Sequence, residues 1–221
     1  MPYRKTEFVE RKRLATRARI IDAATDLVQT GGWKACQLKS VAAAAGVSTG
    51  SVYTHFDRIA DLYIEVFRDI AEAELEVIAE IADGPEAATE RLDVAIDRFA
   101  ARALRGRVKA YAVIGEPVPR QVEVVRQRYR RRFVALFRQI IEDGMAEEAF
   151  DVQDAATTAA CTLGALAEAL ILPLAPEAEA LPDRGNALRW EVRAFCRRAV
   201  GARTTQPARK LHLPATAEEH R

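Results

Sequence analysis

The sequence predicts an all-α protein in which a small N-terminal domain of three helices precedes a larger helical domain. Apolar residues recur at intervals of three and four along most of the chain, which is the spacing of one helix face. Glycine or proline interrupts this pattern at distances that suit helices of ordinary length. No stretch shows the alternating pattern of a strand, so these observations together indicate helices packed on helices.

The first clearly amphipathic helix begins near Ile20. Its apolar face consists of Ile20, Ile21, Ala24, Leu27 and Val28. Thr30-Gly31-Gly32 is expected to end this helix, because glycine readily adopts the left-handed conformation that terminates helices. Leu38, Val41, Ala42 and Ala45 repeat the same spacing and predict a second, shorter helix.

A tight turn and a very short polar helix follow. Gly46 is expected in the turn with a positive φ, and Ser48 is a good N-cap for a helix whose first turn is Thr49-Gly50-Ser51. Val52 and Phe56 are predicted to face inward. The outward residues are then Thr49, Ser51, Tyr53, Thr54 and His55. This is the layout of a helix-turn-helix, whose second helix enters the DNA major groove.

Two functions fit the outward face of the short helix. Short hydroxyls can reach base edges, whereas Tyr53, His55 and the helix N-terminus can hydrogen-bond phosphates. The alternative is a helical hairpin that only packs a small domain. The many small polar groups and the scarcity of charge weaken that alternative, because a solvated face more often carries Glu and Lys.

Charge is distributed unevenly along the chain. The first 56 residues carry nine Lys or Arg and four acids, a net charge of +5, whereas the whole chain has +1 and the remainder therefore −4. A basic N-terminal domain on an acidic body is expected where one end meets a polyanion. The basic run ahead of the helix-turn-helix is interpreted as an arm that reaches the DNA backbone or minor groove.

The rest of the chain reads as six further helices separated by short breaks. The predicted ranges are 57–82, 86–105, 107–115, 119–143, 152–172 and 184–201. Gly144 is expected to stop the long helix, and Glu148 stands near the following turn, before Phe150. Residues 1–56 are therefore assigned to the helix-turn-helix domain, 57–201 to the larger domain, and 202–221, which lack periodicity, to a disordered tail.

Composition argues against several other classes of protein. No uninterrupted apolar run approaches the roughly 20 residues of a membrane span, and the charged N-terminus does not resemble a signal peptide, so we expect a cytoplasmic protein with no membrane partner. Cys36, Cys161 and Cys196 have no metal-site spacing and are expected to be buried free thiols. The chain also lacks a Gly-rich phosphate loop and a nucleophile elbow, so we expect no enzyme, no metal and no cofactor.

The helix-turn-helix region resembles the DNA-binding domain of TetR-family transcriptional regulators. The matching residues are Ile21, Ala24, Leu27, Gly32, Val41, Ala42, Ala45, Gly46, Val47, Ser48, Gly50, Val52, Tyr53, Phe56 and Leu62. The Gly-Val-Ser-x-Gly-x-Val-Tyr-x-x-Phe core is specific, and the match covers about a quarter of the chain. The family usually has a lysine three residues after the phenylalanine, where this chain has Ile59, so Arg58 is expected to take over its phosphate contact.

The resemblance implies double-stranded DNA as a partner, a homodimer, and a small-molecule effector inside the larger domain. The expected DNA-binding residues are Lys39, Ser48, Thr49, Ser51, Tyr53, Thr54, His55 and Arg58. The candidate pocket residues are Phe67, Phe99, Tyr111, Ile114, Arg126, Tyr129, Phe133 and Cys161. Arg128, Arg130, Arg131 and Arg132 are interpreted as a solvated face, and Arg126, at the edge of the apolar stripe, is the candidate for an anionic ligand.

Residues 155–172 are apolar nearly all round, so they require cover on more than one face. With residues 184–201 they either form half of a four-helix bundle with a second chain or lie in an ordinary core, and the family resemblance favours the homodimer. The expected interface residues are Leu163, Leu166, Leu170, Leu188, Val192 and Phe195.

The leading hypothesis is a ligand-responsive repressor that binds a palindromic operator as a homodimer and is released by a small hydrophobic effector. A transcriptional activator of the same fold and a helical protein-interaction module without DNA binding are the alternatives.

Overall fold

The computed structural model describes residues 3–176 and 184–202, and this part of the chain contains nine α-helices and no strand. The helices are α1 (Tyr3–Gly31), α2 (Leu38–Ala44), α3 (Thr49–His55), α4 (Ile59–Ala82), α5 (Ala88–Arg105), α6 (Arg107–Ile114), α7 (Arg120–Ala146), α8 (Ala155–Leu174) and α9 (Arg184–Ala199). The predicted all-α class is confirmed. Residues 203–221 of the expected tail lie outside the described residues, whereas Ala202 is buried and donates its N–H to Arg197 O.

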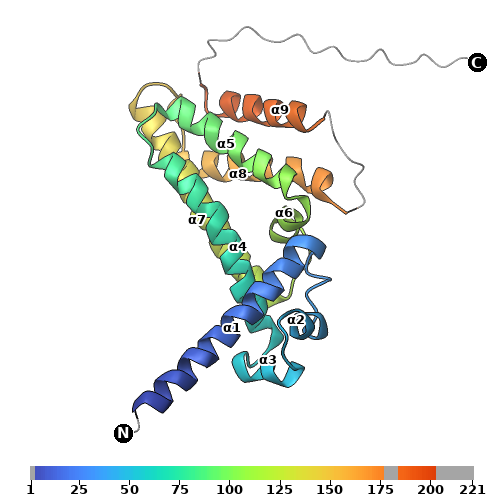
Figure 1. Ribbon diagram of the computed structural model, residues 1–221. Helices are drawn as coiled ribbons and strands as arrows, with labels where there is room; N and C mark the ends of the chain where they lie inside the picture. The colour runs from blue at the N-terminus through green and yellow to red at the C-terminus, as the bar shows by residue number, and fades with distance from the viewer. Residues whose placement is uncertain (1–2, 177–183, 203–221) are drawn as a thin grey trace, which may run out of the picture.

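The long helices α4 and α7 pack against each other and connect the two ends of the molecule (Figure 1). Helices α1–α3 lie at one end, α5, α8 and α9 pack at the other, and α6 lies between them. One buried cluster joins α1–α3 to the first half of α4, to α6 and to the start of α7, and a second fills the space between α4, α5, α7, α8 and α9. The apolar core of the helix-turn-helix therefore continues into the larger domain.

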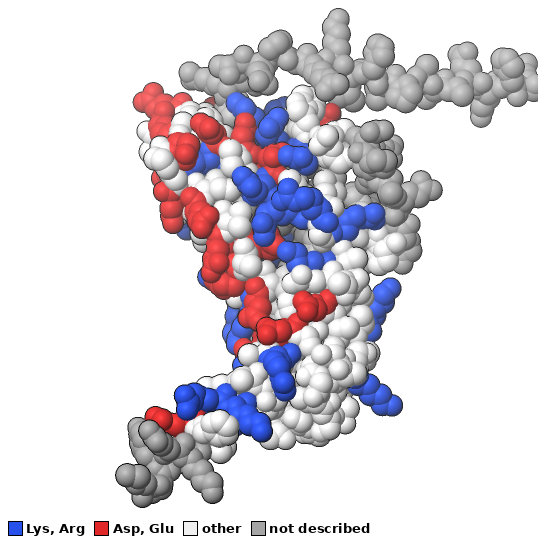
Figure 2. Space-filling model, in the orientation of Figure 1, with Lys and Arg blue, Asp and Glu red and all other residues white. Residues whose placement is uncertain are grey.

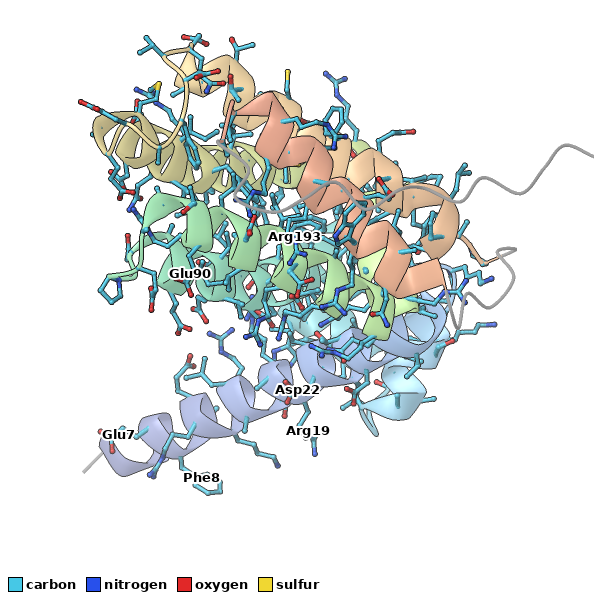
Figure 3. The ribbon with its side chains drawn as sticks, turned by 90° about the horizontal axis from the view of Figure 1, so that it is seen from above. Glu7, Phe8, Arg19, Asp22, Glu90 and Arg193 are labelled. Carbon is cyan, nitrogen blue, oxygen red and sulfur yellow. The ribbon has the colours of Figure 1, made fainter. Side chains whose placement is uncertain are left out.

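Helix α1 begins well before Ile20, the residue at which the sequence pattern indicated a helix. No glycine or proline interrupts the chain between Tyr3 and Gly31, and Glu10 pairs with Arg13 one turn later at 2.8 Å. The first half of α1 extends beyond the body of the molecule and carries the exposed side chains of Glu7 and Phe8 (Figure 3). The basic residues of the expected arm thus lie on a projecting helix.

Gly144 does not end the long helix, contrary to the expectation from the sequence. Helix α7 continues to Ala146, and Gly144 lies inside it, beneath the ring of Phe150. A β-carbon on Gly144 would lie about 2.1 Å from that ring, so glycine is needed here for close packing. The helix ends at Ala146 with Glu147 as its C-cap, and the next residue, Glu148, has a φ of 56°, the only positive value at a non-glycine position in the described chain.

Glu148→Gly is expected to stabilise the protein by about 1 kcal/mol, because the left-handed conformation is costly for a residue with a β-carbon. Glu148 is exposed, so the loss of its side chain creates no cavity. Urea unfolding measures the gain. The control is Glu148→Ala, which keeps the β-carbon, and an equal gain in that variant would assign the effect to the lost carboxylate and contradict the conformational explanation.

Helix α8 is the one described helix whose length and composition would allow it to cross a membrane, with a mean hydropathy of 1.6. In this fold it packs between α5, α7 and α9. Three of the expected dimer-interface residues, Leu163, Leu166 and Leu170, are buried in the core of the single chain, as is Val192. The exposed side of α8 and α9 presents Phe195, which is one of the expected interface residues, and Leu172, which is not. The sequence did not distinguish these two sides because α8 is apolar all round.

Candidate functional site

The turn between α2 and α3 has the geometry expected from its sequence. Gly46 has a φ of 64°, and two hydrogen bonds close the end of α2, from Gly46 N–H to Ala43 O and from Val47 N–H to Ala42 O. This is a Schellman motif, which requires a left-handed residue at the position of Gly46. The chain then enters α3 directly, with Ser48 Oγ accepting the N–H of Ser51 at 3.1 Å. The relative orientation of α2 and α3 is therefore fixed by local bonds.

Val52 and Phe56 are buried, as predicted, so α3 is anchored by one face and presents the other. The expected DNA-binding residues on its exposed side are Ser48, Thr49, Tyr53 and Thr54, with Ser51 half-buried among them and Lys39 exposed on α2. Tyr53 is 51% exposed, which is unusual for an aromatic residue that serves only packing. The structure thus brings the predicted hydroxyls and the phenol onto one surface.

Three of the expected DNA-binding residues already have bonds or neighbours within the protein. Thr54 Oγ1 donates to Gly50 O, which leaves its oxygen free to accept. Burial lowers the pKa of His55, and the guanidinium groups of Arg13 and Arg17 lower it further, so His55 is neutral at pH 7. The guanidinium of Arg58 pairs with Asp61 at 3.1 Å, so a phosphate contact by Arg58 competes with this ion pair.

The loop between α1 and α2 is bonded to the end of α6. The carboxylate of Glu116 accepts the N–H of Trp33 at 3.0 Å and that of Lys34 at 3.3 Å, and the indole Nε1 of Trp33 donates to Ala112 O at 2.9 Å. Gly32 permits this approach, because a β-carbon there would lie about 2.7 Å from the Glu116 carboxylate. Arg126 Nη2 donates to the same Ala112 O and to Glu116 O.

A cavity of about 90 Å³ lies between α4, α5, α6, α7 and α8. Its lining residues are Phe67, Ile70, Ala71, Glu74, Ile78, Phe99, Arg102, Ala103, Lys109, Ala110, Val113, Ile114, Arg126, Tyr129, Arg130, Phe133, Leu163 and Ala167. The lining is mostly apolar and aromatic, which is typical of small-molecule sites, although the volume is below the roughly 300–1,000 Å³ usual for them.

Six of the eight candidate pocket residues line this cavity. These are Phe67, Phe99, Ile114, Arg126, Tyr129 and Phe133. Tyr111 lies outside the lining, and Cys161 is exposed on α8, so the expectations of a pocket residue and of a buried thiol are both wrong for Cys161. Cys36 and Cys196 are buried, and burial raises their pKa values to about 12 and about 11.

Sequence reasoning missed Glu74, Arg102, Lys109 and Arg130 on the lining. Glu74 accepts from Arg102 Nε at 2.5 Å and from Lys109 Nζ at 2.6 Å. Burial raises the pKa of Glu74, but these two cationic partners outweigh burial, so its pKa lies below the usual value and the group is ionised. The sequence could have identified Arg130 as a lining residue, because it lies four residues after Arg126 and therefore on the same face of α7.

Figure 2 shows the surface charge of one face of the molecule. Acidic side chains form a stripe along one edge of the larger domain, and basic side chains lie both on the projecting α1 and across the upper middle of the larger domain. The basic residues of α1 attract a polyanion to that end of the molecule, whereas the acidic edge repels one.

The comparison with family profiles matches both domains. Residues 20–66 match the profile described as bacterial regulatory proteins of the tetR family, and residues 85–170 match that of the tetracyclin repressor-like C-terminal domain. The two matches cover the helix-turn-helix and the larger part of the cavity-bearing domain. No curated protein matches the chain in sequence.

Solved structures share the fold at low sequence identity. The fatty acid degradation regulator FadR from Bacillus halodurans is 17% identical with a TM-score of 0.68, covering 85% of this chain and 97% of that one. Reduced NemR from E. coli is 15% identical with a TM-score of 0.66, covering 85% and 98%. RolR, solved in complex with resorcinol, is 19% identical with a TM-score of 0.63, covering 87% and 91%.

The helix-turn-helix geometry, the helical domain behind it and the two profile matches lead to one assignment. TetR-family proteins are DNA-binding transcription regulators and not enzymes, which agrees with the exposed polar face of α3. The chain belongs to the TetR family of bacterial transcriptional regulators.

Proposed function

We propose that this regulator is a ligand-responsive repressor that binds a palindromic operator as a homodimer in the cytoplasm and is released by a small effector with an apolar body. The observation that carries the proposal is the bonded connection between the cavity and the helix-turn-helix. Arg126 lines the cavity and shares the acceptor Ala112 O with Trp33, which lies in the loop before α2. A ligand that moves Arg126 or α6 therefore acts directly on the position of that loop.

The size of the cavity supports release by an effector. At about 90 Å³, it is too small for a ligand of ordinary size without movement of its walls. A ligand that fits only after such movement binds the moved arrangement better, which is the condition under which binding shifts a conformational equilibrium. RolR, a structure of similar fold, was solved with the small aromatic molecule resorcinol.

The homodimer is proposed to form through the exposed side of α8 and α9. A shallow groove there is lined by Ala165, Ala169, Glu191, Val192, Phe195 and Arg198. Phe195 is 50% exposed and Leu172 is 77% exposed, so this side leaves apolar area in contact with water in the single chain. Small residues on α8 permit close approach of a second helix pair. A dimer supplies two α3 helices, which together read the two halves of a palindrome.

The test is selection of genomic DNA fragments by the purified protein at moderate salt, followed by footprinting of the enriched fragments. A protected inverted repeat is the expected result, and it also names the regulated genes. Absence of enrichment over random duplex by the folded dimer would contradict the proposal. Transcription from the selected promoter with and without the protein separates a repressor from an activator.

A further inference from the structure

The polar part of the cavity lining is strongly cationic. Four cationic side chains and one carboxylate line a cavity that is otherwise apolar: Arg102, Lys109, Arg126, Arg130 and Glu74. Glu74 is bonded to both Arg102 and Lys109, and Glu123, which lies outside the lining, pairs with Arg126 at 2.9 Å, so two carboxylates face four cationic groups. A surplus of positive charge beside an apolar cavity favours an anion, because low-dielectric walls strengthen electrostatic attraction.

Arg126 provides a second, independent observation. Its side chain is buried, with the residue 9% exposed, and its Nη atoms bond to Glu123 and to the carbonyls of Ala112 and Glu116. The Nε–H is buried without a hydrogen-bond partner in the described part of the chain. A buried donor that lacks an acceptor is costly, and an anionic oxygen in the adjoining cavity would supply one.

Arg130 lies one helical turn beyond Arg126 and also lines the cavity. It is exposed, and it forms no ion pair with any residue that the structure describes. Residues four apart on a helix are neighbours, so a group near Arg126 is also within the field of Arg130. The apolar side of the lining includes Phe67, Phe99 and Phe133, which suit a ring or a short chain.

We propose that the cavity takes a small organic carboxylate with a compact apolar body, whose carboxylate is held by Arg126 and Arg130. This inference rests on the proposed function of the cavity as the effector site. A neutral polar ligand would leave the positive surplus uncompensated, and a cationic ligand would be repelled. The small volume favours a single ring or a short chain over a long acyl chain.

The test compares isosteric acids and amides by calorimetry with the full chain and without DNA. The probes are phenylacetate against phenylacetamide and hexanoate against hexanamide. We expect each acid to bind about tenfold more tightly than its amide, as for a charge-assisted contact. Arg130→Gln is expected to remove most of this preference. The matched control is Arg128→Gln, which removes an exposed cation from the same helix outside the cavity lining.

Arg126 itself is left unchanged in the test because it also holds the carbonyls at the end of α6. Equal binding of acid and amide, failure of both acids to bind, or equal effects of the two arginine substitutions would overturn the carboxylate assignment. The measurement is made without DNA, so it is independent of the effector role. Acids that bind selectively but leave operator affinity unchanged would support the ligand class and contradict the proposed release mechanism.

Discussion

Glu116→Ala is expected to reduce strongly the response of operator binding to an effector while leaving the affinity for that effector within about twofold. The carboxylate of Glu116 is the acceptor for Trp33 N–H and Lys34 N–H, so its loss removes two of the three hydrogen bonds that tie the loop between α1 and α2 to the end of α6 and leaves the bond from Trp33 Nε1 to Ala112 O. The backbone carbonyl of Glu116, which Arg126 bonds, is retained. Effector coupling in regulatory proteins is typically 5- to 150-fold, and we expect it to fall to about twofold or less.

Two measurements check this expectation. Operator titrations with and without phenylacetate, on the inverted repeat recovered by selection, give the coupling, and hydrogen exchange at the Trp33 and Lys34 amides reports the loosened loop without any ligand. Glu90→Ala is the control, because Glu90 is an exposed carboxylate on α5, remote from this loop (Figure 3). If Glu116→Ala keeps the full effect of the effector on operator affinity while exchange at both amides is accelerated, then the hydrogen bonds of the Glu116 carboxylate do not couple the cavity to the helix-turn-helix.

Tyr53→Ala is expected to weaken binding to every duplex by about tenfold without changing the preference for the operator. Tyr53 is exposed in the C-terminal half of α3, where a phenol hydroxyl can donate to phosphate. A neutral tyrosine that hydrogen-bonds a phosphate displaces no counterion from the DNA. Its removal should therefore leave the slope of log affinity against log salt unchanged.

Lys39→Ala is the matched comparison, because Lys39 is an exposed cation on the neighbouring helix α2. It is also expected to weaken binding to all duplexes, but with a reduction of the salt slope by about one. Fluorescence anisotropy on the operator and on a scrambled duplex, over a range of salt, measures both quantities. If Tyr53→Ala weakens only operator binding, then Tyr53 reads a base and the phosphate assignment is wrong.

The helix-turn-helix was predictable from the sequence because its geometry is set by neighbouring residues. Gly46 must adopt a positive φ, Ser48 caps the helix that follows it, and both features depend on bonds within a few residues. Glycine also follows the ends of α4, α5 and α6 within two residues, which located these helices in the sequence, whereas α7 continues past Gly144 and α8 includes Pro173.

The polar side of the cavity was not predictable because its residues come from separate helices. Glu74 is 28 residues from Arg102 and 35 from Lys109, and no periodic pattern relates their positions. Gly144 was misassigned for a similar reason. Its role depends on the ring of Phe150 packing onto the helix, a tertiary contact that overrides the usual tendency of glycine to end a helix.

The continuity of α1 has a mechanical consequence. A helix of 29 residues is about 43 Å long at a rise of 1.5 Å per residue. The loop that follows its C-terminal end is bonded to α6, whereas its N-terminal half extends free of the body. A tilt of about 5° about the C-terminal end of α1 displaces its N-terminal end by about 4 Å. The basic residues Arg11, Lys12 and Arg13 lie about 28 Å from Gly31, so the same tilt moves them by about 2.5 Å, close to the length of a hydrogen bond to phosphate.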